Sequence, residues 1–359
     1  MAGDIMTHDL KSSEAFQQAV LTWFDQHGRH DLPWQAEKTA YRTWLSEIML
    51  QQTQVSTVIP YFQRFIERFP DLQSLAEADT DEVLHHWTGL GYYARARNLH
   101  KCAQLIQAEH QGEFPSSVEA LAELPGIGRS TAGAIASIAF NRRAAILDGN
   151  VKRVLTRFHA VEGWSGTPAI MKQLWQYAEH YTPEARCADY TQAMMDLGAT
   201  LCTRSKPDCP ACPLQSDCAA LKLGITNKIP APKPRKTIPV RQTYMLILRN
   251  AAGDILLQQR PPTGIWGGLW SLPEVSDLAA LDTAVKKQHP PVRHTFSHFH
   301  LDITPVEMHV TAEQQQLTDA VMEQPQQLWY NMNQPAKVGL AAPVERLLQQ
   351  LSKQPDSLN

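Results

Sequence analysis

The stretch Leu124-Pro-Gly-Ile-Gly-Arg-Ser-Thr-Ala-Gly133 decides the fold of the larger part of the chain. Pro125 ends a preceding helix, because proline lacks the backbone N–H that a helix interior needs. Gly126 and Gly128 permit a tight turn before an alanine-rich helix, whose first N–H groups have no partner inside the helix and can bind a DNA phosphate. The sequence therefore predicts a helix-hairpin-helix motif. The expected DNA contacts of this motif are Gly126, Gly128, Arg129 and Ser130.

A tight group of cysteines follows further along the chain. Four of the six cysteines have the spacing C-x6-C-x2-C-x5-C, and the N-terminus carries two Asp residues in place of an apolar secretory leader, which argues against disulfides. Four thiolates suit zinc or an iron–sulfur cluster. Structural zinc generally uses two close pairs, and only one close pair is present here. The expected ligands are Cys202, Cys209, Cys212 and Cys218, with Arg204 and Lys206 in the loop between the first two as phosphate contacts.

Two carboxyl groups are distinguished by their neighbours. Asp148 follows an apolar run and precedes a helix that begins near Asn150, so it can cap that helix or face a ligand near the positive end of the helix dipole. Glu47 has apolar helical neighbours, including Trp44 and Ile48, so it points into a poorly hydrated space or lies on a solvated helix face. Burial would raise its pKa and make it a usable acid near neutral pH.

The chain divides into two regions by pattern. Residues 1–223 read as successive helices, with Pro60, Pro70 and Pro115 expected between them. Residues 224–240 form a linker with four prolines and four basic residues. Residues 241–354 contain short β-rich runs, including a hairpin between 243–248 and 255–259 and a strand region at 294–303, and are predicted to form a separate α+β domain.

Composition limits the function classes. The net charge is −3, so nucleic-acid binding must come from a local patch such as residues 125–160, which hold six Lys and Arg residues against Asp148. The longest apolar run, residues 131–140, is too short to span a membrane. We expect a cytoplasmic, nucleoid-associated protein.

Several segments together resemble the MutY family of adenine DNA glycosylases, in the endonuclease III superfamily. The resemblance extends over nearly the whole chain. It rests on SEIMLQQTQV (46–55), WTGLGYYARARNL (87–99), LPGIGRSTAGAI (124–135), ILDGNVKR (146–153), QAMMDLGATLCTRSKP (192–207), RPPTGIWGGLW (260–270), residues 293–300 and VGLAAPVERLL (338–348).

The resemblance implies a fold and a reaction. The fold would be a mainly α helix-hairpin-helix glycosylase, with a six-helix subdomain and a [4Fe–4S] cluster on the four cysteines, followed by a Nudix-like α+β domain. The reaction would be base excision of adenine mispaired with 8-oxoguanine or guanine in double-stranded DNA. Glu47 would protonate the adenine, Asp148 would stabilise the positive charge on the sugar, and Gln51, Gln52 and Tyr92 would enter the duplex.

One position separates two reaction classes. Relatives that also cut the backbone carry a Lys where this chain has Ser130, so we expect a monofunctional enzyme. Lys152 lies near Asp148 in the sequence, and it is both a predicted DNA contact and a group that could trap the abasic product.

The C-terminal domain is expected to read the opposite base. A Nudix hydrolase needs a glutamate-rich box to hold Mg²⁺, and the sequence after Glu274 lacks it. The resemblance implies that 8-oxoguanine is recognised by Phe296, Ser297 and His298, although these side chains could instead be strand core.

Two alternative functions remain open from the sequence. The first is a glycosylase for another mismatch or for an oxidised pyrimidine on the same scaffold, and the second is a non-catalytic DNA-binding protein. The paired carboxyl groups argue against the second. The chain is expected to act as a monomer, and its sequence does not indicate which proteins it binds.

Overall fold

The computed structural model describes residues 12–234, 237–280, 287–309 and 326–353. By their contacts, the residues form two compact units. The helical unit consists of Met1–Ala76 and Lys101–Arg235, and the C-terminal unit consists of Glu77–His100 and Lys236–Asn359. Within the described ranges, no helix is both long and apolar enough to cross a membrane.

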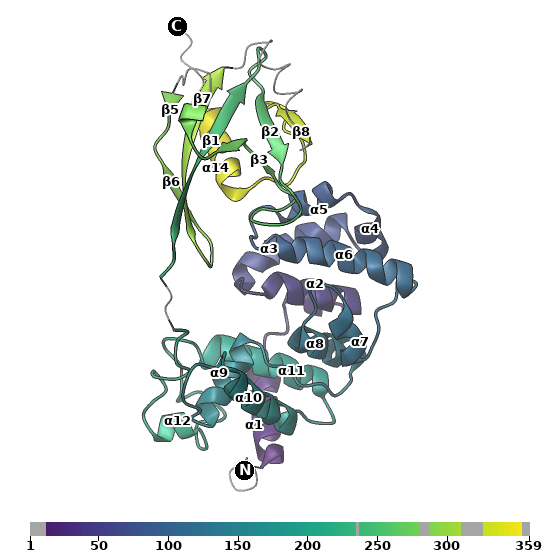
Figure 1. Cartoon of the computed structure of the whole chain (residues 1–359). Helices are drawn as coiled ribbons and strands as arrows, with labels where there is room; N and C mark the ends of the chain where they lie inside the picture. Colours follow the sequence, from purple (N-terminus) through teal and green to yellow (C-terminus); the bar gives the residue numbers. More distant parts are fainter. Residues whose placement is uncertain (1–11, 235–236, 281–286, 310–325, 354–359) are drawn as a thin grey trace. The chain divides into compact units, whose positions relative to one another are not determined.

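The helical unit is built from α-helices and short helical turns (Figure 1). Helix α6 (Ala94–Glu109) begins in the C-terminal unit and continues into this one. The other elements are α1 (Ser13–His27), η1 (Pro33–Gln35), α2 (Ala40–Leu50), α3 (Val55–Arg68), α4 (Leu72–Glu77), α7 (Val118–Glu123), α8 (Arg129–Phe140), α9 (Gly149–Phe158), α10 (Pro168–Tyr181), α11 (Cys187–Asp196), the π-helical turn η2 (Leu197–Leu201) and α12 (Ala219–Lys222).

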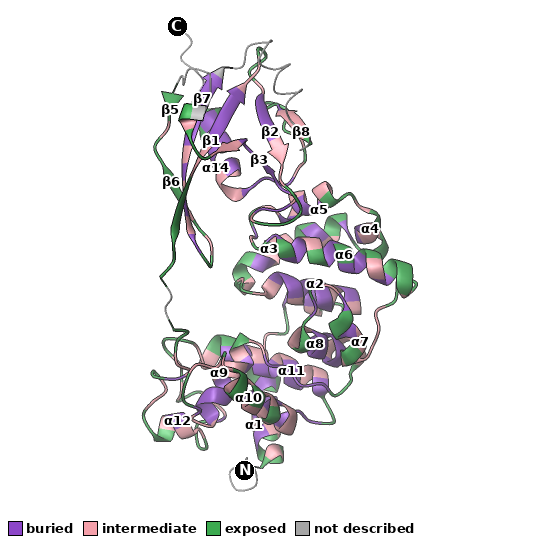
Figure 2. Cartoon of the chain, in the orientation of Figure 1, coloured by how far each residue is buried: buried purple, intermediate pink, exposed green. Residues whose placement is uncertain are grey.

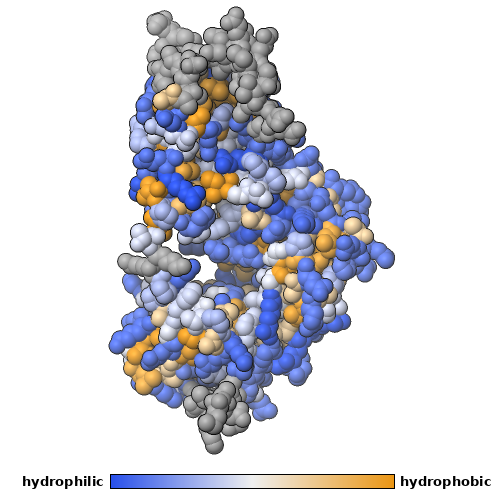
Figure 3. Space-filling model, viewed as in Figure 1, coloured by the Kyte–Doolittle hydropathy of each residue, from blue (hydrophilic) through white to orange (hydrophobic). Residues whose placement is uncertain are grey.

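Side-chain caps and aromatic packing fix these helices. Ser12 and Thr39 each accept a hydrogen bond from a backbone N–H in the first turn of α1 and α2, respectively. The ring of Phe16 in α1 stacks on Tyr181 of α10 with centroids 4.1 Å apart and meets Phe158 of α9 edge-on at 4.9 Å. Figure 2 shows that α2 is largely buried. The face in Figure 3 is predominantly hydrophilic, with apolar residues in small groups.

The expected position of Pro60 between helices is wrong, because Pro60 lies inside α3. Pro60 has no N–H to donate to the carbonyl four residues earlier, so α3 lacks one backbone hydrogen bond at this position. Pro70 and Pro115 do lie between helices.

The elements of the C-terminal unit are α5 (Thr80–Trp87), β1 (Val240–Arg249), β2 (Ile255–Gln259), β3 (Trp270–Ser271), β4 (Glu274–Val275), η3 (Leu278–Ala280), β5 (Lys287–Gln288), β6 (Val292–Thr295), β7 (His300–His309), β8 (Gln327–Tyr330) and α14 (Ala342–Lys353). The strands form a mixed sheet with the order β3-β2-β1-β7-β5. Its centre is the parallel pair β1 and β7, in register from Val240↔His300 to Arg249↔His309, and the other strand pairs within the described residues are antiparallel. The helical and the α+β parts are as predicted.

The strand region expected at residues 294–303 is interrupted. Strand β6 ends at Thr295, a turn closed by the N–H of Phe296 on the carbonyl of Phe299 follows, and β7 begins at His300. The turn leaves Ser297 and His298 exposed, so these two residues are not strand core.

Residues 77–100 fold with strands that lie far along the chain. Asp81 of α5 accepts hydrogen bonds from Gln259 Nε2 at 2.9 Å and from Trp270 Nε1 at 3.2 Å. Arg97 donates to the carbonyl of Gly267, and Leu84 lies so close to Gly339 that a Cβ at this glycine would collide with it. The compact units therefore do not follow the linear order of the chain, and the predicted linker at 224–240 remains a prediction.

Candidate active site

The main candidate site is a cavity of about 810 Å³ in the helical unit. It is lined by segments of α2, the turn after it, the starts of α8 and α9, α11 and the cysteine loop, which is the segment 202–218 that carries the four clustered cysteines. The cavity has the size of a small-ligand site. The predicted site residues that line it are Glu47, Gln51, Gln52, Ser130, Asp148 and Arg204.

Asp148 caps α9 and also lines the cavity. Its Oδ1 accepts from the backbone N–H groups of Asn150 at 3.1 Å and Val151 at 2.8 Å, and its Oδ2 accepts from Asn150 Nδ2 at 3.2 Å. Burial raises the pKa of Asp148, whereas these hydrogen bonds and the positive charge of Arg153 favour its ionised form. The two interpretations from the sequence, a cap and a ligand-facing carboxylate, are thus compatible.

Glu47 lies in α2 between the buried residues Ser46 and Ile48. Burial raises its pKa to about 8, and the negative charge of Asp148 adds to that rise. Glu47 therefore keeps its proton at neutral pH, while Asp148 has the donors that stabilise a carboxylate. A protonated carboxyl group beside one that accepts such hydrogen bonds can divide the roles of acid and anion with it.

Arg153 joins Asp148 to the cysteine loop. Its Nη2 donates to Asn150 Oδ1 at 2.8 Å and to the carbonyl of Gly198 at 2.6 Å, and its Nε donates to the carbonyl of Cys202 at 2.6 Å. Asn150 in turn donates to Asp148. The orientation of the catalytic candidate Asp148 thus depends on the loop that carries the cysteines.

The predicted hairpin between α7 and α8 is present. Gly126 has φ 79°, a left-handed conformation that favours glycine, whereas Gly128 has φ −89°, which any residue adopts. The expectation that Gly128 permits the turn by its backbone freedom is therefore wrong. A Cβ on Gly128 would meet nothing within 4 Å, so the start of α8 is open to an approaching group.

The two residues after Gly128 have partners within the chain. Ser130 Oγ accepts from the backbone N–H of Leu147 at 2.9 Å, one residue before Asp148. The guanidinium of Arg129 stacks on Trp175 at 3.8 Å from the ring centroid and pairs with Glu179 at 2.8 Å. These contacts direct the Arg129 side chain toward α10.

All four clustered cysteines line a second, almost entirely apolar cavity. Burial raises the pKa of Cys212 to about 12, and the charges of the other three thiolates add to the rise, so the four sulfur atoms affect one another. Arg157 Nη1 donates to Cys202 Sγ at 3.3 Å. Among the described residues, no three His, Cys, Asp or Glu side chains are grouped so as to hold a single metal ion. Cys102 and Cys187 are buried elsewhere.

Other predicted contacts are spread over both units. Gln52 and Tyr92 are exposed residues with φ values of 58° and 49°, which is unusual for non-glycine residues and typical of functional positions. Lys152 is half-buried and Lys206 is exposed.

The remaining predicted contacts lie in the C-terminal unit. They are Tyr92 and the turn with Phe296, Ser297 and His298. In this turn Phe296 packs on Trp266 with ring centroids 5.1 Å apart.

Three residues of the site were not found from the sequence. Arg29 and Gln192 line the cavity beside Glu47, and the buried Asp196 contacts both. Arg29 and Asp196 are 167 residues apart, so no local pattern connects them. The sequence does place Asp196 in an apolar helical run, and a carboxylate that is buried in such a run needs a hydrogen-bond or ion-pair partner.

Comparisons with known proteins place the chain among DNA-repair enzymes. Residues 45–180 match the HhH-GPD superfamily of base excision DNA repair proteins, and residues 243–350 match the NUDIX domain. The adenine DNA glycosylase of Buchnera aphidicola subsp. Acyrthosiphon pisum (strain APS) is 38% identical over 347 residues, which is 94% of this chain and 98% of that protein. The adenine DNA glycosylase of Homo sapiens is 38% identical over 324 residues, which is 75% of this chain and 59% of that protein.

Solved structures agree with the fold of the helical part. A thermostable thymine-DNA glycosylase matches with a TM-score of 0.52 and 26% identity, over 59% of this chain and 97% of that one. A non-covalent endonuclease III–DNA complex matches with a TM-score of 0.50 and 21% identity, over 60% of this chain and 99% of that one. With the 38% identity that spans nearly the full length of a curated relative, the resemblance seen in the sequence is confirmed: the chain belongs to the adenine DNA glycosylases, hydrolases of base excision DNA repair.

Proposed function

We propose that the chain is a monofunctional glycosylase that removes adenine mispaired with 8-oxoguanine or, less efficiently, with guanine. One observation carries the proposal: Glu47 and Asp148 line the same cavity, where burial and the charge of Asp148 raise the pKa of Glu47 to about 8, whereas the hydrogen bonds that Asp148 accepts favour its ionised form. This is the two-carboxyl arrangement of glycosidic bond cleavage. The adenine would leave the base stack to enter the cavity, at a cost that a mispair reduces.

The two carboxyl groups have separate tasks in this reaction. Glu47 donates its proton to N7 of the flipped adenine, so that the bond from C1′ to N9 breaks and the base leaves as a neutral molecule. Asp148 stays ionised and stabilises the positive charge on the sugar. Water then adds its hydroxyl to C1′ and gives its remaining proton back to a carboxylate of the site.

The proposed DNA contacts are of two kinds: groups that bind phosphates of the DNA backbone and side chains that enter the duplex. The backbone N–H groups at the start of α8, with Gly126, Gly128, Arg129 and Ser130, would hold a phosphate. For Arg129 we assign this contact to the backbone N–H, since its side chain pairs with Glu179. The groups for other phosphates would be Lys152, Arg204 and Lys206, and those that enter the duplex would be Gln51, Gln52 and Tyr92.

The absence of strand cutting follows from Ser130. Its hydroxyl is bonded to a backbone N–H, and it supplies no amine that could form a Schiff base with the sugar. Lys152 is the amine nearest to Asp148 in the sequence, and any residual cutting would be assigned to it.

The four clustered cysteines would hold a [4Fe–4S] cluster. Their side chains line one almost entirely apolar cavity, as the ligands of a buried cluster would, and the choice of a cluster over zinc rests on the resemblance of their spacing to that of the family. When bound, the cluster would fix the loop that carries Cys202, and through Arg153 this loop supports Asp148.

The C-terminal unit would recognise 8-oxoguanine through Phe296, Ser297 and His298. The proposal is supported by the exposed positions of Ser297 and His298 in the turn between Phe296 and the buried Phe299. The enzyme would act as a monomer on double-stranded DNA in the cytoplasm, where the nucleoid lies.

The test is a single-turnover assay on a duplex with adenine opposite 8-oxoguanine, with each sample divided and one half treated with alkali. Cutting after alkali alone is expected. It should fall by at least about 100-fold in Glu47→Gln and Asp148→Asn, and stay weak on an A·T duplex. Cutting without alkali would contradict the monofunctional assignment. No cutting in either half would contradict adenine excision, and parallel duplexes with thymine or oxidised pyrimidines would then identify the base.

A further inference from the structure

Trp266 is a buried tryptophan in an unusual backbone conformation. It lies in the segment 260–270 of the C-terminal unit, is 7% exposed and has a φ of 52°. Bulky residues rarely adopt this left-handed conformation, and they persist in it where surrounding contacts hold the chain, often at functional positions. The segment is one of those that resemble the MutY family, but the proposed reaction gives it no task.

Arg260 holds the backbone around Trp266. The N–H of Arg260 donates to the carbonyl of Leu269 at 2.9 Å, and its Nε donates to the carbonyl of Ile265 at 3.1 Å. Its Nη1 pairs with Glu274, and its guanidinium lies 5.6 Å from the centroid of the Trp266 ring. One arginine thus fixes the residue before Trp266, closes the loop behind it and lies over its ring.

The ring of Trp266 packs on the start of the exposed turn between β6 and β7. Its centroid is 5.1 Å from that of Phe296 and 5.3 Å from that of His294, which are distances typical of aromatic packing. The other ring partners of Phe296 among the described residues are His294, His298 and Phe299, which all belong to the same hairpin. Trp266 is therefore the ring partner of Phe296 that comes from a separate segment.

A turn at the end of a hairpin needs such a contact if it is to recognise a base. Loop residues with exposed side chains have few contacts that fix their direction, and Ser297 and His298 are both exposed. Specific recognition requires side chains held to within about 0.5 Å by the residues behind them. The contact of Trp266 with Phe296 holds the turn at its first residue, and Trp266 is itself too deeply buried to bind DNA.

We propose that Trp266 is a positioning residue for the turn that reads the base opposite adenine. Its ring, held by Arg260, fixes Phe296 and so directs Ser297 and His298. The inference rests on the proposed recognition of 8-oxoguanine by this turn. Loss of the ring should lower the preference for 8-oxoguanine over guanine, because the turn then takes several directions, while Glu47 and Asp148 still excise adenine.

The experiment compares single-turnover rates of adenine excision opposite 8-oxoguanine and opposite guanine, and the ratio of the two rates is the readout. Trp266→Ala and Trp266→Gly both remove the ring and are expected to lower the ratio by about tenfold. Trp266→Phe keeps an aromatic ring and should keep most of the ratio.

The two variants without the ring also separate positioning from stability. Glycine adopts a φ of 52° freely and alanine does not, so Trp266→Gly should melt at a higher temperature than Trp266→Ala. Their ratios should nevertheless be equally low. A ratio that follows the melting temperature would overturn the proposal, because the tryptophan would then act only through the stability of the fold.

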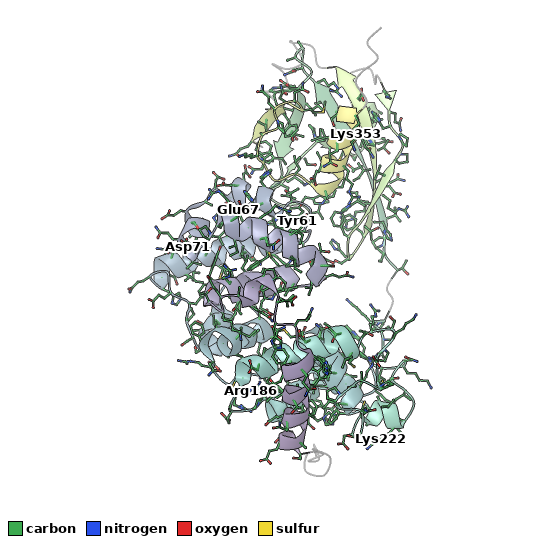
Figure 4. The ribbon with its side chains drawn as sticks, turned by 180° about the vertical axis from the view of Figure 1, so that it is seen from behind. Tyr61, Glu67, Asp71, Arg186, Lys222 and Lys353 are labelled. Atoms are coloured by element: carbon green, nitrogen blue, oxygen red, sulfur yellow. The ribbon has the colours of Figure 1, made fainter. Side chains whose placement is uncertain are left out.

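A matched control lies four positions further along the chain. Trp270 is 6% exposed, and its Nε1 donates to Asp81 of α5 at 3.2 Å. Trp270→Phe should lower the melting temperature and leave the ratio unchanged. Lys353, labelled in Figure 4, is exposed in the last turn of α14, and Lys353→Ala should change neither quantity.

The remaining outcomes are distinct. An unchanged ratio in Trp266→Ala and Trp266→Gly, or an equal loss in Trp270→Phe, would overturn the proposal. If neither variant without the ring folds, Arg260→Lys tests the same loop, because lysine lacks the second nitrogen that holds Ile265, and an unchanged ratio there would overturn the proposal as well. A wild-type protein with no preference for 8-oxoguanine would instead contradict the proposed recognition.

Discussion

Glu47 and Asp148 line one cavity, and the charge of Asp148 helps burial to raise the pKa of Glu47 to about 8. In the proposed mechanism, the carboxylate of Asp148 thus helps to keep the acid Glu47 protonated. This coupling has two consequences, one for the reaction rate and one for stability.

The rate of adenine excision should be lost at high pH. In the proposed mechanism the protonated form of Glu47 is the active one, so the single-turnover rate is expected to be constant between about pH 6 and 7.5 and to fall about tenfold per pH unit well above pH 8. The measurement is a pH profile at saturating enzyme with DNA binding checked at each pH. A rate that keeps rising to pH 9.5 would contradict the role of Glu47 as the acid.

The stability of the fold should depend on the same proton. Because the folded-state pKa of Glu47 is raised from 4.5 to about 8, the folded protein binds this proton more tightly than the unfolded chain, and stability decreases as pH rises between these values. Glu47→Gln removes the effect. We expect it to stabilise the protein by about 2 kcal/mol more at pH 8 than at pH 6 in urea unfolding, and an equal effect at both pH values would argue against a buried, protonated Glu47.

Arg157 should be needed to keep the cysteine loop closed. It is buried, and its guanidinium donates to Cys202 Sγ and to the carbonyls of Thr203, Arg204 and Ile229. A lysine side chain has one ammonium group and cannot donate to all of these acceptors at once. Arg157→Lys is expected to lose the visible absorbance of an iron–sulfur cluster several-fold faster in the presence of a chelator, while Lys222→Arg, at an exposed site in α12, should not change the rate.

The exposed residue His298 in the turn of the C-terminal unit should affect the recognition of 8-oxoguanine but not the stability of the fold. His298→Ala is expected to reduce the preference for 8-oxoguanine over guanine opposite adenine, with the melting temperature unchanged within about 1 °C. Phe299→Ala, at a neighbouring position that is 2% exposed, should instead destabilise the protein by about 3 kcal/mol. A large loss of stability in His298→Ala would mean that this residue supports the turn.

What could be predicted from the sequence was local. The hairpin, the cysteine spacing and the cap at Asp148 each depend on residues within about one turn or loop of one another, and local geometry follows from local sequence. Arg29 and Asp196 are brought together only by packing between α11 and the turn after α1, so their contact has no sequence signal.

The partners of charged residues could not be predicted for a related reason. Six basic residues between positions 125 and 160 indicate a patch for DNA, which stays a prediction. In the structure Arg129 and Arg143 pair with Glu179, and Arg153 and Arg157 donate to backbone carbonyls inside the protein. A sequence lists charges, but it does not say which of them are neutralised within the fold.

The assignment of residues 77–100 to the C-terminal unit has a consequence for synthesis. These residues leave the ribosome long before the strands that contact Asp81, and Leu84 stays without Gly268 and Gly339 until the last part of the chain has been made. Helix α5 therefore cannot reach its native contacts during translation of the helical part. We expect residues 77–100 to complete their packing only after the strands of the C-terminal unit have been made, with the apolar side chain of Leu84 uncovered until then.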